Sequence, residues 1–299
     1  MKPITLLTAL FLPLLLFSCS NGSGEYDATG SFEATEIIVS SQANGGILEL
    51  TVEEGEQLEA GQIVGQIDST QLYLKKMSLL SNAEGIRSQQ PDIHKQTAVI
   101  QQQIRTLEKE RARVKNLLAA NAATQKQLDD IESQIEVQEK QLLASTSTLE
   151  KSSKNISAQS STLEIQIAQL NDQLEKTQII SPISGTVLNR YAEAGELATM
   201  GTPLFKIADT STLYLRAYVT NDQLAQIKLN DEVTVRVDNG EGNMKTYRGR
   251  INWISDKSEF TPKTIQTKNE RANLVYALKI AVPNDGCLKI GMYGEVKFE

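Results

Sequence analysis

The stretch SPISGTVLNRYAEAGELATMGTPLFKIAD, residues 181–209, repeats a motif that the chain has already used once, as ANGGILELTVEEGEQLEAGQIVGQID in residues 43–68. Three pairs of glycines match between the copies: Gly46 with Gly185, Gly55 with Gly195, and Gly61 with Gly201. Short apolar runs separated by glycine-containing polar segments are typical of strands joined by tight turns, where glycine tolerates a positive φ. Each copy is too small to bury a core alone, so the sequence predicts that both copies pack as one β-sandwich.

The segment between the copies, residues 69–177, has apolar residues at every seventh position. One series is Leu72, Leu79, Ile86, Ile93, Ile100, Leu107 and Val114, and the other is Leu128, Ile135, Leu142, Leu149, Ile156, Leu163 and Leu170. This period is typical of a helical seam that is buried against a partner. Because the two series mirror each other about Asn121, we expect an antiparallel hairpin within one chain, with its tip at residues 119–124. A rod formed between chains is the alternative.

Each arm of this hairpin would be about 65–75 Å long at 1.5 Å per residue. Pro91 interrupts the first arm, but Ile86 and Ile93 stay in phase across it. We therefore expect a kink or a restarted helix with the proline near its first turn, and no full break. Asp68 is placed to cap the first arm, with Gln71 three residues later.

The N-terminus begins MKPITLLTALFLPLLLFSCS, with an apolar run at residues 4–17 that is too short to cross a hydrocarbon core of about 30 Å. This predicts a signal peptide at residues 1–18. The letters LFSC resemble the lipobox of bacterial lipoproteins, although Phe17 is bulkier than is usual there. The resemblance implies that Cys19 carries a lipid and that residues 19–25 form a flexible tether. An ordinary secreted protein with an unmodified cysteine is the alternative.

The C-terminal part, residues 210–299, contains five runs with β-branched or aromatic residues, which predicts a small all-β domain. Residues 26–40 are expected to add an N-terminal strand to this β region. A short helix capped by Thr220 or Asn221 is predicted between the first two runs.

Composition and charge argue against several classes of function. The formal net charge of −7 leaves no large basic surface, which disfavours nucleic-acid binding. The single histidine, His94, is expected on a helix surface, and no Cys/His cluster or nucleophile motif indicates an enzyme. We therefore predict no catalytic residues, no cofactor and no metal. Cys287 is the only other cysteine, so acylation of Cys19 would exclude an internal disulfide.

The two copies resemble the two halves of a biotinyl/lipoyl domain. The carrier lysine of such domains has only a superficial match in LKKM, residues 74–77, which lies in a helical pattern. The whole order of elements resembles the membrane fusion proteins, the HlyD-like periplasmic adaptor subunits, over essentially all of the mature chain. That resemblance implies an elongated, multi-domain α+β fold in which a split lipoyl-like β-sandwich holds a long antiparallel coiled-coil α-hairpin and is followed by a β-barrel. The implied segments are residues 41–68, 69–177, 178–209 and 210–299.

The same resemblance implies a non-catalytic adaptor in the envelope of a Gram-negative bacterium. It would be periplasmic, attached to the inner membrane by its lipid, and assembled as a ring of six. It would link an inner-membrane transporter to a TolC-type outer-membrane channel. Residues 260–280, FTPKTIQTKNERANLVYALKI, resemble a segment of adaptors that are paired with ABC transporters. Two alternatives remain: an adaptor of an RND-type drug or metal efflux pump, and a structural coiled-coil lipoprotein, which would leave the split β-motif unexplained.

The predicted tip carries a further resemblance. Family members that dock a TolC-type channel have Arg, then Leu four residues on, then Ser seven residues later, and this chain has Arg113, Leu117 and Thr124 at those spacings. The resemblance implies that these three residues form the docking site, with the guanidinium donating hydrogen bonds, the leucine filling a groove, and the hydroxyl bonding at close approach. The alternative is structural: a solvated flank, the last seam residue and a helix cap.

Overall fold

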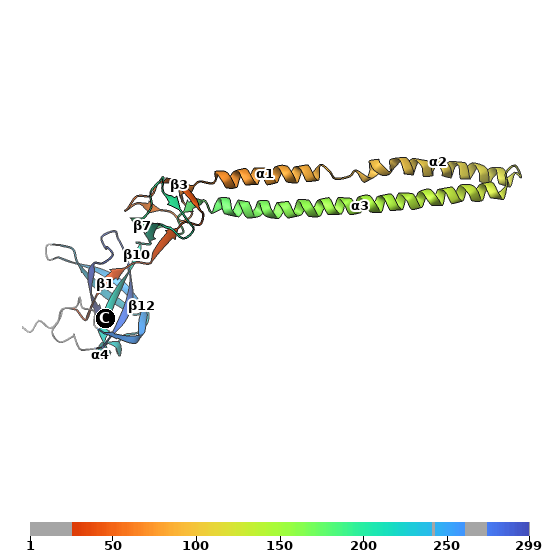
Figure 1. The fold of residues 1–299 in the computed structure, drawn as a ribbon. Coiled ribbons are helices and arrows are strands. Elements are labelled where there is room, and N and C mark those ends of the chain that lie inside the picture. Colours follow the sequence, from red (N-terminus) through yellow and green to blue (C-terminus); the bar gives the residue numbers. More distant parts are fainter. Residues whose placement is uncertain (1–25, 241–242, 261–273, 299) are drawn as a thin grey trace, which may run out of the picture.

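The structure, a computed structural model, describes residues 26–240, 243–260 and 274–298. It is elongated: a closed β-barrel lies at one end, a sandwich of two sheets lies beside it, and a helical hairpin extends from the sandwich (Figure 1). The predicted fold class is thereby confirmed. The predicted signal peptide, Cys19 and the tether, together with residues 261–273, lie outside the described residues.

The sandwich interlocks the two copies of the repeated motif. Its sheets have the strand orders β2-β9-β7-β4 and β6-β5-β3-β8. The strands are β2 (Glu36–Ser40), β3 (Gly45–Leu50), β4 (Gln57–Leu58), β5 (Ile63–Ile67), β6 (Gln178–Ile180), β7 (Gly185–Arg190), β8 (Leu197–Ala198) and β9 (Pro203–Ala208). Gly46 pairs with Leu197, and Leu58 pairs with Gly185, so each sheet contains strands of both copies. The core between the sheets includes the fully buried Ile67, Phe205 and Ile207.

The matched glycines meet two different requirements. Gly55 and Gly195 have φ values of 89° and 94°, and Gly61 and Gly201 have 83° and 90°, which confirms the predicted tight turns. Gly185 has no positive φ, but a Cβ there would lie 2.3 Å from the carbonyl oxygen of Ala208. Close contact between strands therefore requires the glycine at that position.

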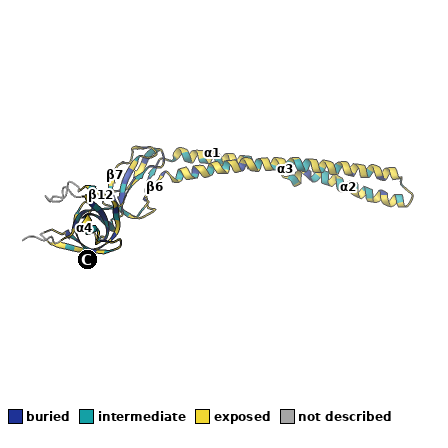
Figure 2. Cartoon of the chain, turned by 90° about the horizontal axis from the view of Figure 1, so that it is seen from below, coloured by how far each residue is buried: buried dark blue, intermediate teal, exposed yellow. Residues whose placement is uncertain are grey.

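The hairpin consists of α1 (Thr70–Arg87), α2 (Ile93–Ala119) and α3 (Gln125–Glu175), and both α1 and α2 pack along α3. The buried side chains along the hairpin come from both series of the sequence repeat and from small residues between them; they include Ala83, Val114, Leu128, Ile135 and Leu170. Figure 2 shows that most of the hairpin surface is exposed, whereas buried residues concentrate in the two β-domains. The hairpin is therefore held by one narrow seam.

The first arm of the hairpin is interrupted. As predicted, a new helix begins close to Pro91, which precedes the N-cap residue Asp92 of α2. Residues 88–92 are not helical, so the expectation of no full break was wrong. Proline lacks an N–H and disfavours a helical residue before it, which accounts for the break. Asp92 Oδ1 accepts a hydrogen bond from the backbone N–H of Lys95 at 3.0 Å. The facing helix α3 continues past the gap without interruption.

The start of α1 also differs from the prediction by one residue. Its N-cap is Ser69, which makes no side-chain capping bond. Asp68 lies one residue further out, and its Oδ1 accepts a hydrogen bond from the backbone N–H of Thr70 at 2.9 Å.

The barrel closes in the order β1-β10-β13-β12-β11-β14. Its strands are β1 (Ala28–Glu33), β10 (Thr212–Thr220), β11 (Glu232–Asp238), β12 (Met244–Phe260), β13 (Leu274–Pro283) and β14 (Tyr293–Phe298). Residues 26–40 are divided between the two β-domains, because β1 belongs to the barrel and β2 to the sandwich. The predicted short helix is α4 (Asn221–Leu224), and its N-cap is Thr220.

The two ends of the barrel have different neighbours. All six barrel strands are antiparallel to their neighbours, so strand starts and strand ends alternate at each rim. The links from β1 to β2 and from β9 to β10 leave from one rim and lead into the sandwich. The opposite rim carries α4, the start of β1 and the end of β14, on the side away from the hairpin (Figure 1).

Candidate functional site

The tip of the hairpin is an ordered turn between α2 and α3. The carbonyl of Leu117 accepts hydrogen bonds from the backbone N–H groups of Ala120 and Ala122 at 3.1 and 2.8 Å. Asn121 has a φ of 57°, in the left-handed region that asparagine tolerates better than most residues. Arg113 and Leu117 precede this turn, and Thr124 follows it. The fold thus gathers the three residues of the predicted docking site at one end of the hairpin (Figure 1).

Thr124 is the N-cap of α3. Its Oγ1 accepts a hydrogen bond from the backbone N–H of Gln127 at 3.3 Å, and the Gln127 side chain accepts one from the Thr124 N–H at 2.9 Å. These reciprocal bonds form a capping box, which satisfies amide groups that the first turn of the helix leaves free. The structural role of Thr124 is therefore explicit, and docking would be an additional role.

Arg113 lies on the exposed surface of α2, where Glu110 holds its guanidinium. Nε donates to Glu110 Oε2 at 3.0 Å, and Nη2 contacts Oε1 of the same carboxylate. This hydrogen bonding lowers the pKa of Glu110 and raises the pKa of Arg113. A partner that binds the guanidinium would have to compete with Glu110 or bind donors that Glu110 leaves free.

Leu117 lies one turn after Arg113, on the same side of α2 because residues four apart are neighbours on a helix. Its side chain is 39% exposed, whereas Val114, three residues earlier, is buried in the seam. Leu117 therefore offers apolar surface just beyond the last tightly buried position of α2.

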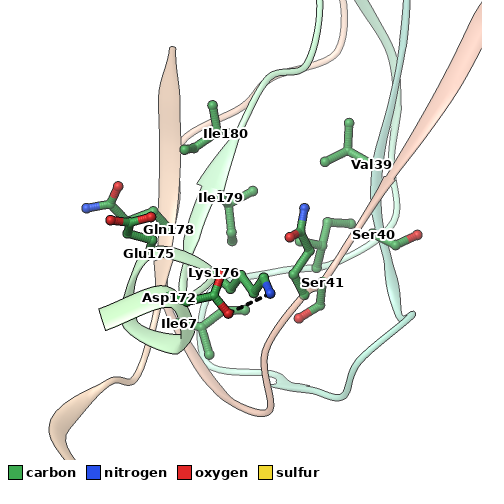
Figure 3. Close-up of a pocket in the computed structure, with 12 residues that line it drawn as sticks. Val39, Ser40, Ser41, Ile67, Asp172, Glu175, Lys176, Gln178, Ile179 and Ile180 are labelled. Carbon is green, nitrogen blue, oxygen red and sulfur yellow. Dashed lines mark hydrogen bonds and ion pairs between the residues drawn. The ribbon is translucent and has the colours of Figure 1, made fainter. Parts of the chain in front are cut away.

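A cavity at the base of the hairpin was not anticipated from the sequence. It has a volume of about 250 Å³ and lies where the end of α3 meets β2 and β6 (Figure 3). Its walls include the apolar Ile67 and Ile179, and Lys176 Nζ and Asp172 Oδ2 form an ion pair at 2.7 Å across its edge. The seven-residue repeat does not indicate how the end of a helix packs against a sheet, so no signal in the sequence predicts this cavity.

A second cavity of about 630 Å³ shares the Asp172–Lys176 pair and extends between the start of α1, Asn44 and Met200. The two cavities are lined by amides, serine hydroxyls, apolar side chains and a few charged groups, which include the Asp172–Lys176 pair and the carboxylates of Glu175 and Asp68. Within residues 26–240, 243–260 and 274–298, no cluster of three His, Cys, Asp or Glu side chains could hold a metal ion. Both cavities are joints between the hairpin and the sandwich.

Two residues singled out in the sequence lie on the surface. His94 is exposed on α2, as predicted. Cys287 is a free, exposed thiol on the link between β13 and β14, and its Sγ lies 3.4 Å from Lys245 Nζ. The hydrogen bond to Asp285 raises the pKa of Lys245. Among the helices in the described part of the chain, none is long and apolar enough to cross a membrane.

The sandwich with its inserted hairpin defines a membrane fusion protein. A family model described as the RND MFP barrel-sandwich hybrid domain matches residues 35–210, and the chain belongs to this family. The match covers both copies of the motif and the hairpin between them.

Particular relatives share part of the sequence. The UPF0194 membrane protein YbhG of Salmonella arizonae is 36% identical over 126 residues, which cover 42% of this chain and 38% of the relative. A UPF0194 membrane protein of Yersinia pestis is 37% identical over 131 residues, which cover 44% of this chain and 39% of the relative. The alignments thus span less than half the length of these relatives.

Solved structures share the fold at lower identity. MacA from Actinobacillus actinomycetemcomitans is 20% identical with a TM-score of 0.53, over 91% of this chain and 78% of that one. The membrane fusion protein Spr0693 from Streptococcus pneumoniae R6 is 18% identical with a TM-score of 0.51, over 91% of this chain and 97% of that one.

Proposed function

We propose that this chain is a non-catalytic adaptor that joins an inner-membrane transporter to an outer-membrane channel across the periplasm. The observation that carries the proposal is the distance between the hairpin tip and the barrel. The 51 residues of α3 alone extend about 75 Å at 1.5 Å per residue. A rod of this length, with different β-domains at its base, suits a protein that holds two partners apart.

The proposal includes attachment to the inner membrane through a lipid on Cys19. The support is the lipobox-like LFSC sequence and the short polar segment that follows it. At least two acyl chains give stable anchoring, because each buried CH₂ contributes about 0.8 kcal/mol. The barrel, which begins at Ala28, would then lie close to the membrane, and the hairpin would project into the periplasm.

The transporter is proposed to be of the ABC type, and the adaptor to form a ring of six. The support for the transporter class is the resemblance of residues 260–280 to adaptors of that kind. An RND-type pump is the second candidate, and the description of the matching family model as RND MFP favours it. A TolC-type channel is the proposed partner at the tip.

Docking to the channel is assigned to Arg113, Leu117 and Thr124. The support is that the three residues lie around one ordered turn, with an exposed guanidinium and a half-exposed leucine on one face of α2. Arg can donate several hydrogen bonds to carbonyls or carboxylates on helices of a channel, and Leu can fill a groove.

Co-purification tests the proposal directly. The full chain, tagged at its C-terminus, is extracted from membranes after brief cross-linking, and the captured proteins are identified by mass. We expect one inner-membrane transporter and one outer-membrane channel. A matched chain with Leu117→Asp should still capture the transporter and lose the channel. Recovery of neither partner by the unaltered chain would exclude the adaptor function, and the identity of the transporter decides between the ABC and RND classes.

A further inference from the structure

The barrel rim that faces away from the sandwich carries exposed apolar side chains. We call it the distal rim and define it by Tyr26, Leu229, Phe260 and Leu274. Tyr26 precedes β1, Leu229 lies between α4 and β11, and Phe260 and Leu274 end β12 and begin β13. Neighbouring strands of the closed barrel are antiparallel, so starts and ends of strands alternate around this rim. The start of β1, the link before β11, the end of β12 and the start of β13 therefore all lie on it.

These side chains are not part of the barrel core. Their exposed fractions are 84% for Phe260, 55% for Leu229, 53% for Leu274 and 42% for Tyr26. In the wall of the barrel, buried and less buried residues can alternate strictly, as in β10, where every second residue is buried. Phe260 lies directly opposite Leu274 in the pairing of β12 with β13, so these two residues form one apolar pair at the edge. Exposed apolar side chains that gather on one rim, and are not scattered singly, indicate a surface that contacts another phase or molecule.

The chain enters the barrel at a fixed point on the same rim. The backbone N–H of Asp27 donates to the carbonyl of Val296 at 2.8 Å, and Asp27 Oδ2 accepts from the N–H of Phe298 at 2.9 Å. Gln223 of α4 donates its Nε2 hydrogen to the Asp27 carbonyl at 2.6 Å. Three hydrogen bonds therefore fix the position from which the N-terminal segment leaves.

The length of that segment limits how far the rim can lie from an anchored lipid. Cys19 is seven residues before Tyr26. Even a fully extended chain spans at most about 3.6 Å per residue, so seven residues reach about 25 Å. If Cys19 is acylated as proposed above, the distal rim is within about 25 Å of the bilayer surface.

Three carboxylates at the distal rim form hydrogen bonds or ion pairs with other residues of the barrel. Asp231 Oδ2 accepts from the backbone N–H of Lys228 at 2.7 Å. Glu259 pairs with Arg216 at 3.1 Å, and Glu232 pairs with Arg250 at 3.2 Å. Further charges of both signs lie on the same rim: Asp222, Lys228 and Lys297. With both signs present, apolar contact and not electrostatic attraction would hold this rim to a surface.

We infer that the distal rim rests on the bilayer, with Phe260 and Leu274 inserted at the boundary between headgroups and acyl chains. Aromatic and apolar side chains are favoured at this depth. The inference rests on the acylation of Cys19 in the proposed function. Its consequence is that the barrel has two attachments to the membrane, the lipid and the rim, and so takes a fixed orientation.

The test uses the full acylated chain, with Cys287→Ser so that one introduced cysteine can be labelled. A bimane fluorophore is placed at Phe260→Cys or, as the matched control, at Tyr293→Cys. Tyr293 is also exposed, at 68%, but it starts β14 at the opposite rim. Each chain is reconstituted into phosphatidylcholine vesicles, with or without phosphatidylglycerol, and the vesicles carry a lipid with a nitroxide near the headgroup. Flotation measures attachment, and the mass of the N-terminal peptide measures acylation.

We expect bimane at position 260 to be quenched at least twofold and to emit at a shorter wavelength, and bimane at position 293 to be unchanged. The result should be the same in both lipid mixtures and in high salt. A chain that floats without quenching at position 260 overturns the rim contact and leaves the anchor intact. A chain that does not float overturns both. Shielding of position 260 from aqueous iodide only after a membrane-protein extract is added, without lipid quenching, identifies a protein partner and overturns the bilayer contact.

Discussion

Arg87 on α1 is hydrogen-bonded to Ser160 on α3, with Arg87 Nε donating to Ser160 Oγ at 3.0 Å. The same guanidinium contacts Glu164 one turn further along α3. Arg87 is the last residue of α1, so this contact fastens the end of the helix immediately before the interruption at residues 88–92. Within the interruption, Gln90 Nε2 donates a hydrogen bond to Ser153 Oγ on α3 at 3.2 Å.

Arg87→Ala should loosen the end of α1 without unfolding the hairpin. The Arg87 side chain is about half exposed, so we expect a loss of about 0.2–1 kcal/mol, the range of surface ion pairs. Hydrogen exchange of the last turn of α1 measures the effect. Lys95→Ala, which removes an exposed ion pair on α2, is the control and should leave that turn unchanged. Equal exchange rates in the two variants would contradict the fastening role.

Ile135→Asp should destabilise the hairpin strongly. Ile135 is 4% exposed, and a carboxylate buried there without a partner would cost several kcal/mol. Val137→Asp changes a neighbour on the exposed face of α3 and should be tolerated. Thermal unfolding followed by helical circular dichroism compares the two variants, and similar midpoints would mean that Ile135 is not a seam residue.

Cysteines at positions 107 and 135 should form a disulfide within one chain if the arms have the predicted mirror register. Leu107 lies beside residues 133–138 of α3, which places it at the level of Ile135. Mass measurement of the oxidised Leu107→Cys/Ile135→Cys chain in a Cys287→Ser background distinguishes the outcomes. Disulfides between chains instead would favour an intermolecular rod.

Substitutions at the tip should abolish channel recovery and leave the fold intact. Leu117→Asp and Arg113→Asp each disturb a proposed central contact, which can contribute about 2 kcal/mol or more. Thr124→Ser should be tolerated. Thr124→Asp separates the two roles, because aspartate is a good N-cap but would add a charge to the interface. A pull-down with Lys151→Asp, lower on α3, is the comparison, and equal recovery for tip and control variants would refute the docking assignment.

Cys19→Ser should release the protein into the soluble envelope fraction without changing its fold. The described structure begins with Tyr26, seven residues after this position, and the barrel strand β1 begins at Ala28. Labelling with a radioactive fatty acid measures acylation directly. Label retained by Cys19→Ser would show that the lipid is attached elsewhere.

Gly185→Ala should destabilise the sandwich, whereas alanine at Gly46, its counterpart in the first copy, should have little effect. A Cβ at position 185 would lie 2.3 Å from the Ala208 carbonyl oxygen, whereas a Cβ at position 46 meets nothing within 4 Å. Forcing strands apart typically costs about 1–3 kcal/mol, as in other overpacked cores. Denaturant unfolding of both variants is the measurement, and equal midpoints would show that the strands separate without strain.

The fold could be predicted because two of its patterns are local and repeated. The matched glycines fix turns through φ, and the seven-residue series fixes a seam, so Gly55, Gly195 and the two arms were all visible in the sequence. Pro91 marked the place of the interruption, but its extent over residues 88–92 was not visible, since Ile86 and Ile93 keep the same phase whether or not the residues between them are helical. Likewise, alternation in residues 26–40 predicts strands but does not say which sheet each strand joins.

The candidate site was less predictable. The mirror symmetry about Asn121 located the tip, and the spacing of Arg113, Leu117 and Thr124 singled out three residues beside it. The bonds of Thr124 to Gln127 and of Arg113 to Glu110 could not be predicted, because they depend on where the helices end. The cavities beside Asp172 and Lys176 and the exposure of Phe260 result from packing between distant segments. No local pattern encodes them.

The exchange of strands between the two copies constrains the order in which the chain can fold. In their sheets, β2 has only β9 as a neighbour, and β4 has only β7. β4, which belongs to the first copy, and β2, which precedes that copy, therefore remain without partners until the second copy has been synthesised, and loop closure of this length is slow. The turn at Asn121 offers a shorter route to the sandwich. The two arms can pair first at the tip and then step by step towards the base, which brings residues 178–209 close to residues 36–67. Pairing of the arms would therefore help the sandwich to assemble. A chain truncated before Gln178 would lack the partners of β2 and β4 and leave these two strands exposed to aggregation.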